Sequence, residues 1–433
     1  MNAKLIQLSF VTLLCGGLFA CEGPAGADGV DGVDGVAGTN GDDGDDGVRG
    51  SSCWDLNEDG VADDNEDING DGEVNIMDCQ TADTGDGFPV WVGSEACAEC
   101  HDEHYQKFIR SGHPYKLVET GGVQPIPAWE SDFTGDFGHY APEPPAGFEW
   151  SDISHVIGGW GWKQRFVDND GYIITGDAVQ FNLVDDSMTA YHADEDPGTK
   201  PYDCGTCHTS GYRPEGNQYD MPGMIGTWEQ GGVHCEECHG EGSFHIEAPY
   251  DEHMKIDRTA DQCGTCHYRT SPDVIPASGG YGKHHQQWNE IFHSQKHSMD
   301  CIDCHDPHSS AHWSDEDYNP NQSIGAYCAD CHFIEAANQK STTMEAFASC
   351  EDCHMPYATK SALAAGTYEG DVRTHLFGIN TDVTATQINE AGDDMNSYVS
   401  LDFACKGCHS DEGPWTTYSD QVLEQMAVGY HDR

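Results

Sequence analysis

Residues 97–101 read Cys-Ala-Glu-Cys-His, and the pattern Cys-x-x-Cys-His occurs eight times in this chain of 433 residues. A lone pair of cysteines at this spacing is also compatible with a zinc site or a redox dithiol. Neither of those needs a histidine directly after every pair, so eight complete copies exclude both. Numbered 1 to 8 in chain order, the motifs are Cys97/Cys100/His101, Cys204/Cys207/His208, Cys235/Cys238/His239, Cys263/Cys266/His267, Cys301/Cys304/His305, Cys328/Cys331/His332, Cys350/Cys353/His354 and Cys405/Cys408/His409.

The motif predicts eight covalently bound haems c. Its two thiols add to haem vinyl groups as thioethers, and the adjoining imidazole ligates the iron. Because the link is covalent, a loop-rich chain can hold the cofactor without a deep pocket. Apolar residues are only 37% of the chain, below the usual share of roughly 45–50%, so haem macrocycles must supply part of the core. We therefore expect a mostly irregular fold with short α-helices around the haems.

The composition limits the possible partners. Asp and Glu number 76 against 19 Lys and Arg, which gives a formal net charge of −57. Nucleic acid is excluded because its binding needs clustered Lys and Arg, and an anionic membrane would repel the chain unless a lipid anchor tethers it. Such a surface favours cationic or metal-bearing partners, namely redox proteins or an external acceptor such as a metal oxide.

The N-terminus predicts export. Residues 1–20 have the features of a signal peptide, with Lys4 before an apolar run that is too short to span a bilayer. The run ends in Leu18-Phe19-Ala20-Cys21, which resembles a lipoprotein signal with Cys21 as the lipidated residue. This places the protein on the outer membrane or cell surface; ordinary signal-peptidase cleavage would make it periplasmic or secreted.

Residues 21–50 carry the lipidation site and a collagen-like stalk. Glycine recurs at every third position from Gly23 to Gly47. Since the nine triplets contain one proline and many aspartates, we favour a hydrated flexible stalk over a stable trimer.

Residues 51–87 form an acidic insert that predicts two calcium ions. Two loops of the EF-hand type follow each other directly, with Gly60 and Gly72 at the bends. With no room for helices between them, they look like thrombospondin-type or dockerin-type loops; a solvated acidic linker is the alternative. Cys53 and Cys79 flank the insert, and we expect them to form a disulfide. The candidate calcium ligands are Asp55, Asn57, Asp59, Asp63, Glu66, Asp67, Asn69, Asp71, Asn75 and Asp78.

Residues 88–433 are expected to form the octahaem domain, with a small antiparallel β meander at about 160–190. Its strands are predicted at 163–167, 172–175 and 179–184, with an Asp-Asn-Asp-Gly turn at 168–171.

The segment Gly93-Ser94-Glu95-Ala96-Cys97-Ala98-Glu99-Cys100-His101, followed by Tyr105, Phe108 and Ser111-Gly112-His113, resembles the multihaem c-type cytochromes of bacterial respiration. Within them it is similar to the tetrahaem cytochromes that accept electrons from hydroxylamine oxidoreductase in nitrifying bacteria. The superfamily resemblance covers residues 90 to 410, and the closer match covers only the first segment. The extra motifs depart from a four-haem pattern, so partner and direction of electron flow do not carry over.

The sixth ligand of each iron decides between an electron carrier and an enzyme, because an iron with two imidazoles has no open site for substrate. Sixteen histidines remain outside the motifs. His192, His253 and His431 are interpreted as surface residues. Of the neighbouring residues His284 and His285, we expect only one to be a ligand. The candidate distal ligands are His113, His234, His245, His284, His285, His293, His297, His308 and His375.

Two functions stay open. The first is an electron carrier with closely packed haems, which could also assemble into filaments or oligomers. The second is an octahaem reductase or dehydrogenase that acts on a small nitrogen or sulfur compound at one open iron, with Arg110, Tyr115 and Lys116 as residues to inspect. A purely structural or adhesive surface protein would not explain eight haem motifs.

Overall fold

The computed structural model describes residues 88–125, 140–250, 254–310, 323–339 and 343–432. The signal peptide, Cys21, the stalk, the calcium insert with Cys53 and Cys79, and His253 lie outside the described residues. Within the described ranges, no helix has the length and apolar character needed to cross a membrane.

The predicted β meander is confirmed as a five-stranded antiparallel sheet in the order β1-β2-β3-β4-β5. Its central strands are rich in β-branched and aromatic residues, which suit a half-buried pleated surface, and Val156, Phe166 and Val167 are fully buried. The strands are β1 (Leu117–Glu119), β2 (Ile153–Gly158), β3 (Lys163–Asp168), β4 (Gly176–Asn182) and β5 (Ser187–Tyr191).

The strand predicted at residues 172–175 forms only in part. Ile173 forms an isolated antiparallel bridge with Val167, and Tyr172 forms one with Pro201. The backbone N–H of Ile174 donates to the Phe166 carbonyl, which keeps the segment beside β3, while the N–H of Ile173 donates to the Lys200 carbonyl on its other side. Local alternation of apolar residues could not reveal this partner, which is distant in sequence.

The helices are short apart from α1 (Ser94–Phe108), as expected from the sequence. The other α-helices are α2 (Gly205–His208), α3 (Cys235–His239), α4 (Ser243–Glu247), α5 (Ala260–Gly264), α6 (Gln287–His293), α7 (Cys328–Cys331), α8 (Phe333–Gln339), α9 (Cys350–His354), α10 (Gly407–His409) and α11 (Asp420–Ala427). Single helical turns are η3 (Trp150–Asp152), η4 (Gln218–Asp220), η5 (Cys301–Asp303), η6 (Thr343–Ala346), η7 (Asp402–Lys406) and η8 (Tyr430–Asp432).

The remaining strands form small pairs. They are β6 (Thr209–Ser210) with β9 (Gln230–Gly231), β7 (Arg213–Asn217) with β8 (Ile225–Thr227), β10 (Ala277–Ser278) with β11 (Tyr281–Lys283) and β12 (Thr359–Lys360), and β13 (Ile379–Asn380) with β14 (Val399–Ser400).

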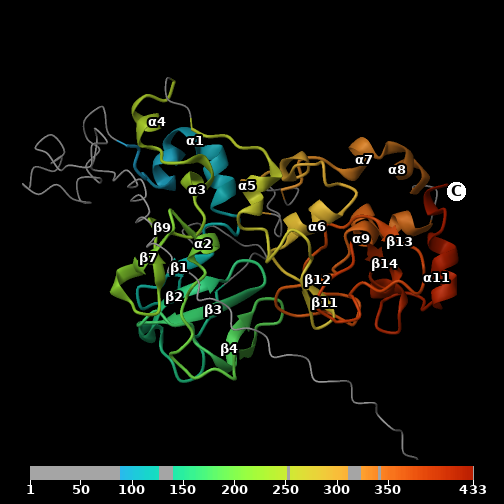
Figure 1. Ribbon diagram of the computed structural model, residues 1–433, viewed down its shortest axis with the longest axis horizontal. Coiled ribbons are helices and arrows are strands. Elements are labelled where there is room, and N and C mark those ends of the chain that lie inside the picture. The colour runs from blue at the N-terminus through green and yellow to red at the C-terminus, as the bar shows by residue number, and fades with distance from the viewer. Residues whose placement is uncertain (1–87, 126–139, 251–253, 311–322, 340–342, 433) are drawn as a thin grey trace, which may run out of the picture.

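This arrangement spreads the motifs along the molecule. In Figure 1 the five-stranded sheet lies at the lower left, and motif-bearing helices run from α1 and α3 through α5 to α7 and α9 at the right. One apolar core packs on the sheet around Phe166 and Phe181, and another lies in the C-terminal half around Leu376 and Phe403. The motifs therefore occupy the space beside two apolar cores.

Candidate metal centres

One helical turn arranges each motif for its chemistry. With 3.6 residues per turn, a Cys, a second Cys three residues on and a His four residues on project from the same face. The motifs lie on α1, α2, α3, α5, η5, α7, α9 and the η7–α10 junction or directly after them. Each turn thus presents two thiols and one imidazole to the same space.

That space is one continuous cavity of about 3430 Å³. All sixteen motif cysteines and all eight motif histidines line it. A pocket for one small ligand usually has a volume of roughly 300–1,000 Å³, so this cavity has room for several large groups. The donor set and the cavity fit a row of covalently bound haems.

The thiols do not suit the other readings of the motif. All sixteen are free, without a disulfide between the two cysteines of a motif. In the part of the chain that the structure describes, no three His, Cys, Asp or Glu side chains converge on a point where they could hold a metal ion. A structural zinc site needs four such ligands.

Contacts between cysteines of different motifs define an order. Thiols of motifs 1 and 3, 2 and 4, 4 and 5, and 6 and 7 lie close enough to perturb each other's titration directly. Thiols of motifs 3 and 4, 5 and 6, and 7 and 8 lie within the longer range of electrostatic interaction. The motifs therefore follow the path 1-3-4-5-6-7-8, and motif 2 is a side branch on motif 4. The pairs are Cys97–Cys235, Cys207–Cys266, Cys263–Cys301, Cys328–Cys350, Cys238–Cys263, Cys304–Cys331 and Cys353–Cys405.

Several motif imidazoles face a second imidazole across the cavity. Two ring nitrogens each about 2.0 Å from one metal put the ring centroids about 6 Å apart. The pairs at this spacing are His101–His245 at 6.3 Å, His239–His308 at 6.2 Å, His305–His375 at 6.2 Å and His354–His431 at 5.8 Å. His267 faces both His113 at 6.4 Å and His285 at 6.2 Å.

Two further candidates, His234 and His284, do not face a motif imidazole. His234 uses both ring nitrogens in hydrogen bonds, to Ser94 Oγ at 3.0 Å and to the Gly231 carbonyl at 2.9 Å. His284 contacts Arg269 at 3.4 Å and packs against His285, but it is absent from the cavity lining. Neither is therefore kept in the ligand set that we propose below.

His293 and His297 line the cavity beside motif 6. Each donates its Nδ1 hydrogen to a backbone carbonyl, of Asn289 and Ser294 respectively. This orientation leaves Nε2 available to a metal. Between them, Lys296 Nζ lies 2.9 Å from His332 Nε2.

His431 was missed by sequence reasoning, which interpreted it as a surface residue. The structure places its ring 5.8 Å from that of His354, nearly parallel, on the cavity wall. No local pattern marks it, because only the return of the C-terminal segment brings it to motif 7. His192 does lie at the surface, where it pairs with Glu195.

Hydrogen bonds orient most motif imidazoles. The Nδ1 atoms of His239, His354 and His409 lie 2.7–2.9 Å from backbone carbonyls. That of His267 contacts Gln287 Oε1 at 3.1 Å, and that of His305 contacts Ser323 Oγ at 3.3 Å. Such partners fix the ring and direct Nε2 to the metal.

His208 of motif 2 has no such partner. Its Nδ1 is buried without a hydrogen bond in the described part of the chain. Burial, with smaller contributions from Lys116, Arg165, Arg269 and Lys163, lowers the pKa of His208 to about 3. A cluster of four cations stands out in a chain with only 19 Lys and Arg.

Lys116, one of the three residues to inspect, lies in that cluster. It lines the cavity, and burial lowers its pKa to about 8. The other two residues form hydrogen bonds with α1 and the residue that follows it. The Tyr115 hydroxyl donates to the Ile109 carbonyl at 2.5 Å, and the Arg110 guanidinium donates to the Gln106 carbonyl.

Comparisons with known proteins agree with the assignment of these motifs to bound haems. The family model described as "Cytochrome c554 and c-prime" matches residues 180–240, which contain motifs 2 and 3. The dissimilatory sulfite reductase MccA of Wolinella succinogenes is 26% identical over 254 residues, with 41% of this chain and 35% of that protein covered. This chain is a multihaem c-type cytochrome. It spans about a third of the length of that relative.

One solved structure supports the fold of this multihaem cytochrome, and a second is only a weaker match. The octahaem sulfite reductase MccA of Wolinella succinogenes superposes with a TM-score of 0.55 at 17% identity, over 79% of this chain and 72% of that one. The outer cell wall cytochrome OcwA gives a TM-score of 0.47 at 16% identity, over 78% and 86%. The c554-type match lies at residues 180–240, whereas the sequence resemblance was drawn from the segment around motif 1.

Proposed function

We propose that this cytochrome carries eight haems c and transfers electrons along the path 1-3-4-5-6-7-8, outside the cytoplasm and at the cell surface. The observation that carries the proposal is that cysteines of successive motifs are neighbours along the wall of one cavity. Thioether sulfurs in contact bring the edges of neighbouring macrocycles together. Each bound haem supplies a one-electron iron couple.

The histidine pairs support transfer over catalysis at most of the irons. We propose the axial pairs His101/His245, His239/His308, His305/His375 and His354/His431, and His267 with His113 or His285. His293 and His297, which lie beside motif 6, remain for the iron of that motif, and no second imidazole is proposed for motif 8. An iron held between two imidazoles has no position for substrate, so these haems can only pass electrons.

The test is an intact mass combined with a spin count. The mature full chain should carry eight haem masses, and at least six of its ferric irons should be low-spin. A colourless protein, or a mass equal to the polypeptide plus zinc, would contradict the proposal. The redox partner is proposed to be a cationic protein or a metal-bearing acceptor, because the chain carries a net charge of −57.

A second function is favoured by motif 2. No ring contact joins His208 to a second imidazole among the described residues, although His285 lies within electrostatic range of it, and the basic side chains Lys116 and Arg269 line the cavity nearby. These features support an open iron that binds a small anion, and the relative MccA is named a dissimilatory sulfite reductase. The alternative function is therefore reduction of a small oxyanion of sulfur or nitrogen at the motif 2 haem.

Ligand titration separates the two functions. A reductase should show one high-spin ferric signal that changes on addition of sulfite or nitrite. Lys116→Met should weaken this change while the chain keeps eight haems. A wild-type protein with eight low-spin irons would exclude the reductase and leave the electron carrier.

A further inference from the structure

Glu290 is a carboxylate buried inside the protein on α6, with 1% of its surface exposed. Its Oε2 accepts hydrogen bonds from the backbone N–H of His375 at 2.6 Å and from the Thr374 hydroxyl at 3.1 Å. Its Oε1 accepts from the Thr359 hydroxyl at 3.1 Å and from the Gln286 amide at 3.4 Å. An ionised carboxylate is a pure acceptor, and all four donors are uncharged. Glu290 therefore places a negative charge in the interior.

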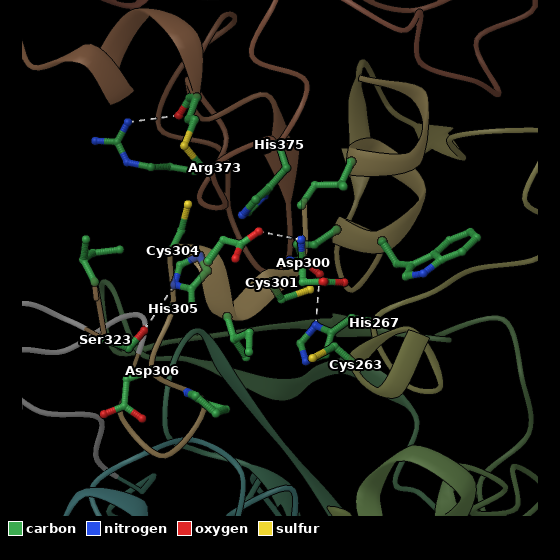
Figure 2. Close-up of a pocket in the computed structure, with 18 of the residues that line it drawn as sticks. Cys263, His267, Asp300, Cys301, Cys304, His305, Asp306, Ser323, Arg373 and His375 are labelled. Carbon is green, nitrogen blue, oxygen red and sulfur yellow. Dashed lines mark hydrogen bonds between the residues drawn. The ribbon is translucent and has the colours of Figure 1, made fainter. Parts of the chain in front are cut away.

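A buried charge is costly unless an opposite charge faces it. In the described part of the chain, the one cationic side chain within ion-pair distance of Glu290 is His375, whose Nδ1 lies 3.7 Å from Oε2. This Nδ1 is itself buried without a hydrogen-bond partner there. The ring of His375 faces that of His305 next to Cys304 (Figure 2). If His375 holds an iron together with His305, as proposed above, that iron would be the positive charge that Glu290 faces.

We propose that Glu290 is a positioning residue that lowers the reduction potential of the motif 5 haem by stabilising its ferric state through His375. The proposal rests on the eight-haem electron carrier proposed above. Because Glu290 lies 3.7 Å from the ring nitrogen of His375, beyond hydrogen-bond distance, its charge would stabilise the ferric iron by electrostatics through a low-dielectric interior, and burial around the axial ligands sets haem potentials. Since motif 5 lies between motifs 4 and 6 on the path, Glu290 sets the potential of a haem that every electron must pass.

Asp306 offers a matched comparison within the same chain. It lies 3.2 Å from Nδ1 of His308, the proposed second ligand of the motif 3 haem. Unlike Glu290, Asp306 also pairs with Lys107 at 3.3 Å, and its side chain is 31% exposed. Solvent and the lysine screen its charge, so its effect on the haem should be smaller. The other oriented imidazoles described above donate to neutral carbonyl, amide or hydroxyl groups.

The experiment is a redox titration of the full haem-loaded chain, followed by absorbance and electron paramagnetic resonance. In Glu290→Gln, one of the eight components should move to a higher potential by at least 59 mV, a tenfold change in its ferric-to-ferrous ratio. Asp306→Asn should move a different component by less. Thr359→Val, which removes a hydrogen bond to Glu290 but keeps the charge, should leave the potentials unchanged.

Each outcome has a defined meaning. Unchanged potentials in Glu290→Gln, or an equal shift in Thr359→Val, would overturn the proposal, the latter because packing and not charge would then be the cause. If Glu290→Gln fails to load its haems, Glu290→Asp retains the charge at a greater distance, and a shift in the same direction is expected. A wild-type chain with fewer than eight haems would instead contradict the proposed function.

Discussion

The imidazole rings of His239 and His308 lie 6.2 Å apart and within 2° of parallel. His239 belongs to motif 3, whereas His308 follows motif 5 in the sequence. The same exchange occurs at motif 1, whose His101 faces His245 beyond motif 3. An iron held between such a pair would cross-link distant segments, which explains how a chain with a limited apolar core can fold.

Removal of His308 should open one iron. His308→Ala leaves His239 as the only imidazole on the motif 3 haem, so one of eight ferric irons should become high-spin while all eight haems stay attached through their thioethers. The electron paramagnetic resonance spectrum measures this change. His192→Ala is the control, because His192 pairs with Glu195 at the surface and should leave the spectrum as it is. An unchanged spin count in His308→Ala would remove His308 from the ligand set.

The motif 4 haem should have a distinct spectrum. The ring of His267 is inclined by 80° to His113 and by 74° to His285, whereas the other proposed pairs are inclined by 47° or less. Nearly perpendicular imidazoles give a strongly anisotropic low-spin signal, so the oxidised protein should show at least one. Comparison of His113→Ala with His285→Ala identifies the ligand, since only its loss should remove that signal. Loss in neither variant would contradict both assignments.

The attachment sites could be predicted from sequence because they are local. A Cys, a Cys three residues on and a His four residues on share a helical face wherever the turn forms, and the structure places all eight sets on one cavity. The second imidazoles are not local. His245, His308 and His375 had recognisable sequence contexts, whereas His431 had none, since its place beside His354 depends on the path of the C-terminal segment.

In the sheet, too, sequence predicted the local features and missed the contacts between distant segments. Alternation of apolar and polar residues predicted strands at 163–167 and 179–184, and β3 and β4 lie there with shifted ends. The strand β1 (Leu117–Glu119) could not be anticipated, because its three residues pair with residues 155–157 of β2, which are distant in sequence. The order of the motifs in space was equally inaccessible, since motif 2 branches from motif 4 and motif 1 contacts motif 3.

Lys163 should make stability depend on pH. Burial, with help from Arg165, lowers the pKa of Lys163 from 10.5 to about 7. Between these values the unfolded chain binds a proton that the folded chain lacks, so the free energy of unfolding should rise with pH across this window. Below about pH 7 the cost of the buried charge is fully present. Lys163→Met should flatten the rise, as measured by chemical denaturation at pH 7 and pH 9.5. Lys255→Met, at an exposed lysine, serves as the control, and an equal slope in wild type and Lys163→Met would contradict the expectation.

The branch point at motif 4 should control internal electron transfer. Thiols of motif 4 contact motifs 2, 3 and 5, so the paired change Cys263→Ala and Cys266→Ala should separate motifs 1–3 from motifs 5–8. Equilibration among the haems after a pulse of photoreduction should then slow by at least tenfold, because electrons must cross a gap one macrocycle wide. The matched change Cys405→Ala and Cys408→Ala removes a haem at the end of the path, and the rate among the others should stay close to that of the wild type. Equal rates in the two variants would mean that the order inferred from the thiol contacts is wrong.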